Sequence, residues 1–103
     1  HHDVGYAMRE LVNWMVAAIA GVAAPETGGP VERYDYVRRC AAGDRPANVP
    51  TPVAALISRY APVATVMNDF YWNLFGESRA TPYPARQVER AMSSIPGYPA
   101  PPA

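Results

Sequence analysis

The fold is decided by one stretch of the chain, residues 53–75, which reads VAALISRYAPVATVMNDFYWNLF. Apolar side chains recur in it every three or four residues, which is the period of an amphipathic α-helix. The period therefore predicts one helix from Val53 to Phe75, with a single apolar stripe facing a core. The stripe is formed by Val53, Leu56, Ile57, Tyr60, Val63, Ala64, Met67, Phe70, Tyr71, Leu74 and Phe75.

The residues at both ends of this stretch agree with a helix of that length. Thr51 is placed to cap the first turn, and Pro52 suits the first helical position. Gly76 follows the last apolar residue and can adopt the left-handed conformation that often ends a helix.

Pro62 lies inside the predicted helix. A proline there removes one backbone donor and clashes with the carbonyl of Ser58, which costs about 3 kcal/mol or bends the helix. Pro62 shares the polar side with Thr65 and Asp69, where water can bind the freed carbonyl. We therefore expect one helix bent at Pro62, and two helices broken near Pro62 are the alternative.

A first helix is predicted from about Val4 to Ala24, with Asp3 as its N-cap. Small residues beside Trp14 form a second face that would allow another helix to approach closely, so we expect this helix to be buried on two sides. Its main stripe comprises Met8, Leu11, Val12, Met15, Ile19 and Val22, and its small face comprises Ala17, Ala18 and Gly21.

Two shorter segments complete the predicted helices. One runs from about Val31 to Ala42, with Pro30 at its first position and Gly43 as its stop. The other runs from about Pro84 to Ser94, and its apolar side is formed by Val88, Ala91, Met92 and Ile95. Clusters of proline and glycine separate the four segments, and no alternating strand pattern stands beside them.

The pattern predicts an all-α fold, a small bundle of about four helices in one domain over residues 1–95. An extended tail over residues 96–103 should follow, because its prolines exclude a helix and favour a polyproline course. A chain of 103 residues is enough for one core.

Composition excludes several classes of protein. The formal net charge is 0, with all nine basic residues being Arg, so no overall field draws the chain to nucleic acid or an anionic membrane. Hydrophobic residues make up 50% and charged residues 17% of the chain, which is too apolar for a disordered tail. So small a share of charged residues is unusual for a freely soluble monomer and favours a protein that contacts a partner.

Catalytic and metal-binding signatures are missing from the sequence. Cys40 is the single cysteine, and the two histidines are His1 and His2, so neither a nucleophile with a base nor a set of metal ligands can be assembled. We expect no enzyme activity, no cofactor and no metal. One cysteine also excludes an internal disulfide, which favours an intracellular or organelle protein, soluble or within a complex.

The apolar run from Trp14 to Ala24 is shorter than the ~20 residues that span a bilayer. A buried helix is the favoured interpretation, and membrane contact by the first helix is the less favoured one.

Aromatic and arginine side chains indicate contact surfaces, because these residue types dominate interface hot spots. Trp72 falls on the polar side of the long helix and needs a cover, either from another part of this chain, with the Pro-rich tail as candidate, or from a partner. We therefore predict partner contacts at Trp72, Arg59, Tyr98 and Trp14. The leading hypothesis is a non-catalytic structural or protein-interaction subunit of a larger assembly, bound to a protein partner or to copies of itself.

Residues 59–68 support an alternative. Arg59-Tyr60-Ala61-Pro62-Val63, followed by Asn68, resembles a stretch in the coat proteins of flexible filamentous plant viruses. That resemblance implies a helical subunit that coats RNA, with guanidinium groups on phosphates and rings on bases. RNA coating is therefore the second hypothesis.

Overall fold

The computed structural model describes residues 2–21, 30–46, 49–76 and 81–97. Within these ranges the chain forms four helices and no strand, which confirms the all-α prediction. The helices are α1 (His2–Ala18), α2 (Pro30–Ala41), α3 (Thr51–Gly76) and α4 (Ala85–Ser93). Residues 98–103, which include most of the predicted tail, lie outside the described ranges.

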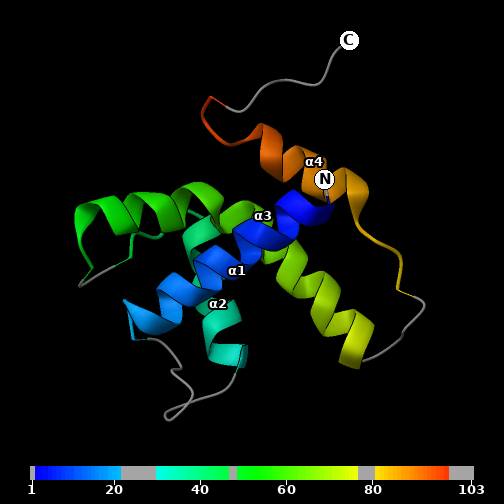
Figure 1. Cartoon of the computed structure of the whole chain (residues 1–103), viewed down its shortest axis with the longest axis horizontal. Helices are drawn as coiled ribbons and strands as arrows, with labels where there is room; N and C mark the ends of the chain where they lie inside the picture. The colour runs from blue at the N-terminus through cyan, green and yellow to red at the C-terminus, as the bar shows by residue number, and fades with distance from the viewer. Residues whose placement is uncertain (1, 22–29, 47–48, 77–80, 98–103) are drawn as a thin grey trace.

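The long helix α3 is the centre of the bundle, and α1, α2 and α4 all pack against it (Figure 1). It runs without interruption through Pro62, and its ribbon changes direction near its middle. The prediction of one bent helix is therefore confirmed, and the alternative of two broken helices is wrong.

Two hydrophobic clusters meet along α3. The first joins α3 to α1 and α2, and the second joins α3 mainly to α4. Tyr60 packs against both clusters, close to the bend at Pro62. The bend thus coincides with the point at which the core passes from one set of helices to the other. The first cluster contains Val12, Met15, Val16, Val37, Cys40, Ile57, Ala61 and Ala64, and the second contains Val63, Met67, Val88, Met92 and Ile95.

The helix ends differ from the predictions in instructive ways. Thr51 is the first helical residue of α3 rather than its cap, and Gly76 is its last residue without adopting a positive φ. Gly43 does end α2 in the predicted manner, with φ +116°. The Asp44 N–H donates to the Arg39 carbonyl at 3.0 Å and the Gly43 N–H to the Cys40 carbonyl at 3.1 Å, the pairing of a Schellman motif.

Two predictions for α1 are wrong. The helix ends at Ala18 rather than Ala24, and Asp3 lies inside its first turn rather than capping it. The buried face is also rotated, because Val12, Met15 and Val16 face the core while two members of the predicted stripe, Leu11 and Ile19, are exposed. The expected second buried side is uncovered, since Ala18 is exposed there and Trp14 is 60% exposed.

The close approach of another helix occurs at Gly5 instead. This glycine is buried, and a Cβ built on it would lie 3.3 Å from the Sδ of Met67. The small residue of α1 that allows α3 to approach closely is therefore Gly5. It lies on a different face of α1 from Ala17 and Ala18, two of the small residues that the sequence indicated.

Candidate interaction surfaces

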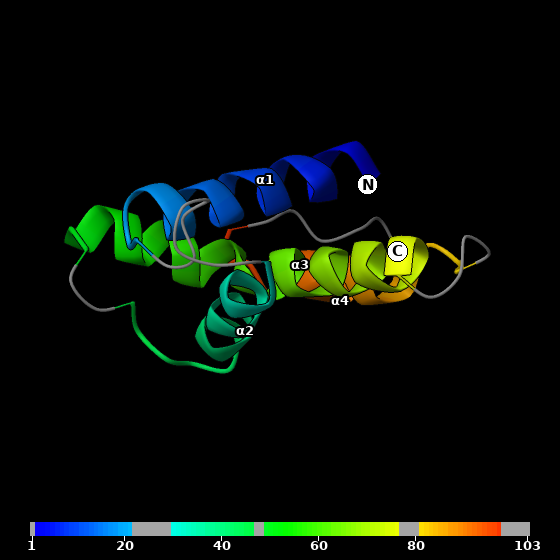
Figure 2. The ribbon, with the colours of Figure 1, turned by 90° about the horizontal axis from the view of Figure 1, so that it is seen from below.

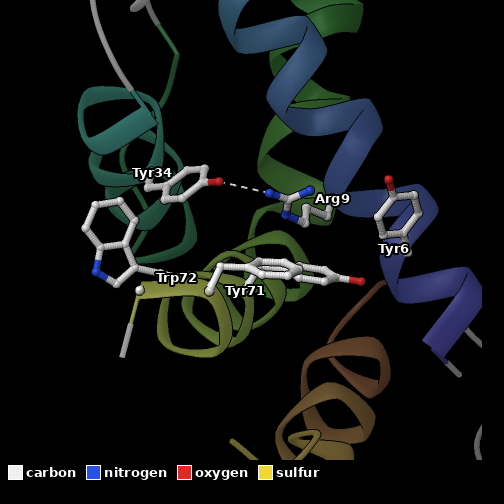
Figure 3. Close-up of a pocket in the computed structure, with 7 residues that line it drawn as sticks. Tyr6, Arg9, Tyr34, Tyr71 and Trp72 are labelled. Atoms are coloured by element: carbon white, nitrogen blue, oxygen red, sulfur yellow. Dashed lines mark hydrogen bonds between the residues drawn. The ribbon is translucent and has the colours of Figure 1, made fainter. Parts of the chain in front are cut away.

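Three helices bring seven residues around an open pocket of about 630 Å³ at the last turns of α3 (Figure 3). We call this the aromatic pocket. Five of the seven residues are aromatic, and the other two are Arg9 and Gly76. The residues are Tyr6 and Arg9 from α1, Tyr34 from α2, and Tyr71, Trp72, Phe75 and Gly76 from α3.

Arg9 holds the pocket together. Its Nη2 donates a hydrogen bond of 2.8 Å to the hydroxyl of Tyr34, and its guanidinium carbon lies 4.8 Å from the ring centre of Tyr71. Its Nη1 forms an ion pair of 2.6 Å with Glu10, so the charge is matched inside the same helix. The side chain is only 14% exposed, and its buried Nε–H has no hydrogen-bond partner among the described residues.

The rings contact one another edge to face and face to face. Tyr6 meets Tyr71 at 5.9 Å between ring centres, and Tyr71 stacks on Phe75 at 5.8 Å. Burial raises the pKa of Tyr71, while the nearby Arg9 lowers it by a smaller amount. The Tyr71 hydroxyl therefore stays protonated at neutral pH and adds no charge to the pocket.

Trp72 forms one wall of the pocket and is half covered. Its ring meets the edge of Tyr34 at 6.2 Å, so α2 supplies part of the cover that the sequence demanded. The side chain remains 48% exposed. On its other side Trp72 lines a second hollow, beside the ion pair between Arg38 and Asp69. The hydrogen bond from Arg38 to Asp69 is the main cause that raises the pKa of Arg38.

A second surface lies on the outer side of α1. Of the described elements, α2, α3 and α4 all lie on the other side of this helix (Figure 2). Val4 is 45%, Leu11 42% and Trp14 60% exposed. With the exposed Ala7 and Ala18 they follow one another at intervals of three, four, three and four residues. We call Val4, Ala7, Leu11, Trp14 and Ala18 the α1 outer face.

The four residues predicted from sequence do not form one site. Trp72 lies in the aromatic pocket and Trp14 on the α1 outer face. Arg59 belongs to a third place, an open groove of about 680 Å³ between the first half of α3 and the end of α4, where its Nη2 donates to the Pro96 carbonyl at 2.6 Å. Tyr98 lies outside the described residues.

Sequence reasoning missed Arg9 and Tyr6 as parts of a surface. A signal for Arg9 was present, because it falls three or four residues from Gly5, Val12 and, one turn further, Val16, which are all buried. A charged residue on a buried helical face needs partners, and here they are a carboxylate and two tyrosines.

The residues that carry the viral-coat resemblance serve the core in large part. Ala61 and Val63 are fully buried, and Asn68 is 1% exposed. Arg59 is exposed but bound to the Pro96 carbonyl. Of this string, then, one guanidinium group reaches the surface, and it is already hydrogen-bonded.

Comparison of the chain with protein-family models, with curated proteins and with solved structures found no match. Within the described ranges no helix is both long and apolar enough to cross a membrane. Among the same residues no three His, Cys, Asp or Glu side chains gather in a group that could hold a metal ion.

Proposed function

We propose that this chain is a non-catalytic structural subunit that assembles with copies of itself through the α1 outer face. The observation that carries the proposal is the exposure of Val4, Leu11 and Trp14 on a helix that is already buried along its other side. An exposed apolar face on a helix whose opposite side is already buried is suited to a partner.

The spacing of the face favours another helix as that partner. Intervals of three and four residues over Val4 to Ala18 are those of a coiled-coil seam, in which side chains of one helix insert between those of the next. The seam is about 21 Å long at 1.5 Å per residue.

A second copy of α1 suits this seam because the seam combines large and small side chains. Ala7 and Ala18 leave room for the bulk of Leu11 and Trp14 from a facing helix, as two-fold related copies require. The seam itself carries no charge, and Glu10 at its edge is already paired with Arg9. From Ala7 to Ala18 a second copy therefore meets no unpaired cation or anion, and Asp3 lies beside the first residue of the seam, Val4.

The test is the mass of the chain in native buffer over a range of concentrations, by light scattering. We expect a dimer or larger species for the unchanged chain and a monomer of 11.2 kDa for Trp14→Glu. Trp72→Glu is the matched control, because it places the same charge at another exposed tryptophan and should leave the mass unchanged. An unchanged chain that stays monomeric at every concentration would overturn the proposal, as would a Trp14→Glu variant that assembles normally.

The RNA-coating hypothesis predicts a different behaviour. A protein that coats RNA neutralises phosphates, so its retention on a polyanion should weaken steeply as salt is added. The self-assembly proposal predicts the same mass with and without RNA and no retention at low salt. Salt-sensitive retention would favour the RNA hypothesis instead.

A further inference from the structure

The groove beside Arg59 combines an apolar surface with a cation. It lies between the first half of α3 and the end of α4, has a volume of about 680 Å³, and is called the Arg59 groove below. Ala55, Leu56 and Pro62 supply carbon surface from α3, and Leu56 is 40% exposed there. Arg59 is exposed in the same stretch of the helix. No Asp or Glu is among the described residues that line the groove.

The end of α4 holds the guanidinium group of Arg59 in place. Its Nη2 donates to the Pro96 carbonyl at 2.6 Å, and its central carbon lies 5.7 Å from the centre of the Tyr60 ring. An arginine head carries several N–H donors, so others remain for a ligand. In the part of the chain that the structure describes, no carboxylate pairs with Arg59. A cation that is held in position without an anionic partner suits an anionic ligand.

Pro62 adds a hydrogen-bond acceptor to the same groove. In an α-helix the carbonyl of Ser58 accepts from the N–H of the residue four positions later, which here is Pro62, and proline has no N–H. Ser58 and Pro62 both line the groove, and Ser58 is exposed. Because α3 continues through Pro62, the Ser58 carbonyl stays beside the groove without its regular helical donor. A ligand that carries an N–H group can take the place of that donor.

Each of these features matches one group at the end of a polypeptide chain. The terminal carboxylate matches Arg59, the last amide N–H matches the Ser58 carbonyl, and an apolar last side chain matches Leu56. An alkyl carboxylate lacks the N–H, and an internal peptide segment lacks the carboxylate. Capture of a terminal carboxylate is an established mode of peptide recognition, and the volume of the groove is that of a ligand site.

We propose that the Arg59 groove binds the free C-terminus of a partner polypeptide whose last side chain is apolar. Arg59 binds the terminal carboxylate, the Ser58 carbonyl accepts from the last amide N–H, and Leu56 contacts the last side chain. The groove shares no residue with the α1 outer face or with the aromatic pocket. The inference therefore does not depend on assembly through α1, and Trp72 plays no part in it.

Fluorescence anisotropy of a dye-labelled peptide tests the site on the full chain. The probe is Ala-Ala-Leu with the dye on its N-terminus and a free C-terminus. We expect saturable binding with a dissociation constant of about 1 mM or below. The same peptide with an amidated C-terminus should bind about tenfold more weakly, because it loses the charged contact. Ala-Ala-Gly, which lacks the apolar side chain, should also bind more weakly.

Variants of the chain assign the binding to the groove. Arg59→Gln should weaken binding of the free acid about tenfold and leave the affinity of the amidated peptide unchanged. Arg86→Gln changes an exposed arginine of α4 that does not line the groove, so this matched control should bind both peptides normally. Circular dichroism checks that each variant folds.

Pro62→Ala tests the acceptor, because alanine restores a helical N–H to the Ser58 carbonyl. This variant should bind the free acid more weakly than the unchanged chain does. A peptide methylated on its last amide nitrogen has no N–H to donate, so it should bind the unchanged chain and Pro62→Ala alike.

Equal binding of the free acid and the amidated peptide would overturn the inference, as would equal losses from Arg59→Gln and Arg86→Gln. Octanoate that displaces the probe with the affinity of the peptide itself would indicate a fatty-acid site and would also overturn it. The peptide comparisons use the unchanged chain, so they stand even if a variant fails to fold. Assembly through α1 is measured separately, from the mass of the chain without peptide.

Discussion

Asn68 of α3 and Asn13 of α1 exchange two amide hydrogen bonds across the interior of the bundle. The Asn13 Nδ2 donates to the Asn68 Oδ1 at 2.9 Å, and the Asn68 Nδ2 donates back to the Asn13 Oδ1 at 3.2 Å. Asn68 is 1% exposed, so each amide depends on the other for its partner. The pair fixes how α1 lies along α3, because sliding either helix would bury two unsatisfied amides.

The first prediction concerns this pair. Asn68→Ala should lower the free energy of unfolding by about 1–3 kcal/mol, because it leaves the amide of Asn13 partly buried and unpaired. The double variant with Asn13→Ala should cost less than the sum of the two single changes. Urea unfolding measures all three variants. Asn73→Ala, on the same helix, is the control, and simple additivity of the two single losses would contradict the prediction.

Gly5 gives the second prediction, through its contact with Met67. Gly5→Ala should leave stability unchanged or raise it by up to about 1 kcal/mol, since alanine favours the helix and the flexible Met67 side chain can shift. Gly5→Leu should destabilise the fold by about 1–3 kcal/mol, because the site has no room for a large side chain. Thermal unfolding of both variants decides the matter, and a tolerated leucine would show that α1 and α3 are not closely packed at this point.

Thr65 provides the third prediction. Its Oγ1 is buried and has no hydrogen-bond partner among the described residues. Thr65→Val keeps the shape and removes the unsatisfied hydroxyl, so the free energy of unfolding should stay the same or rise by up to about 1 kcal/mol. Thr65→Ser is the matched control, which keeps the hydroxyl and loses the methyl group and should be less stable. A valine variant weaker than the serine variant would argue that the hydroxyl is satisfied.

The fourth prediction is a loss of stability at alkaline pH. Burial raises the pKa of the Cys40 thiol, with a further contribution from Asp44, and burial also raises the pKa of Tyr71 and Tyr83. In each case the folded chain holds its proton more tightly than the unfolded chain. Stability from Cys40 is therefore complete below the ordinary thiol pKa, about 8.5, and is lost as pH rises through the raised value.

Urea midpoints between pH 7 and about 11 measure this loss, because the ordinary tyrosine pKa is about 10. Cys40→Ala should flatten the decline that begins near pH 9, while the two tyrosines should still weaken the variant at higher pH. In the unchanged chain Cys40 should react slowly with thiol reagents until the protein unfolds, because the thiolate is the reactive form. Rapid labelling of the folded chain at pH 7 would contradict the assigned environment.

Sequence alone predicted the extent of α3 well, because the periodic apolar stripe is strong. Two members of that stripe, Leu56 and Phe75, are nevertheless exposed. It placed the helix at Val53–Phe75, and the structure has it at Thr51–Gly76. It predicted the buried face of α1 only in part, since Val12 and Met15 are buried as predicted while Leu11 and Ile19 are exposed, because apolar residues on several sides of a helix leave the period ambiguous. The error explains why Leu11 was assigned to the core.

The candidate surfaces could be predicted only in part. Trp72 stood out as a large ring on a polar side, and that residue does line the aromatic pocket. The pocket as a whole could not be predicted, because Tyr6, Tyr34 and Trp72 come from three helices and meet only through tertiary packing. Arg59 and Trp14 were predicted as partner contacts by residue type alone, and residue type does not specify where in the fold they lie.

The dependence of every other helix on α3 also sets the order in which the fold should open. Amides near Pro62, between the two hydrophobic clusters, should exchange with deuterium last, since exposing them requires both clusters to separate. The short helix α4 rests on the second cluster and should open earlier. Residues 81–97 could then loosen as one unit while α1, α2 and the first half of α3 stay folded.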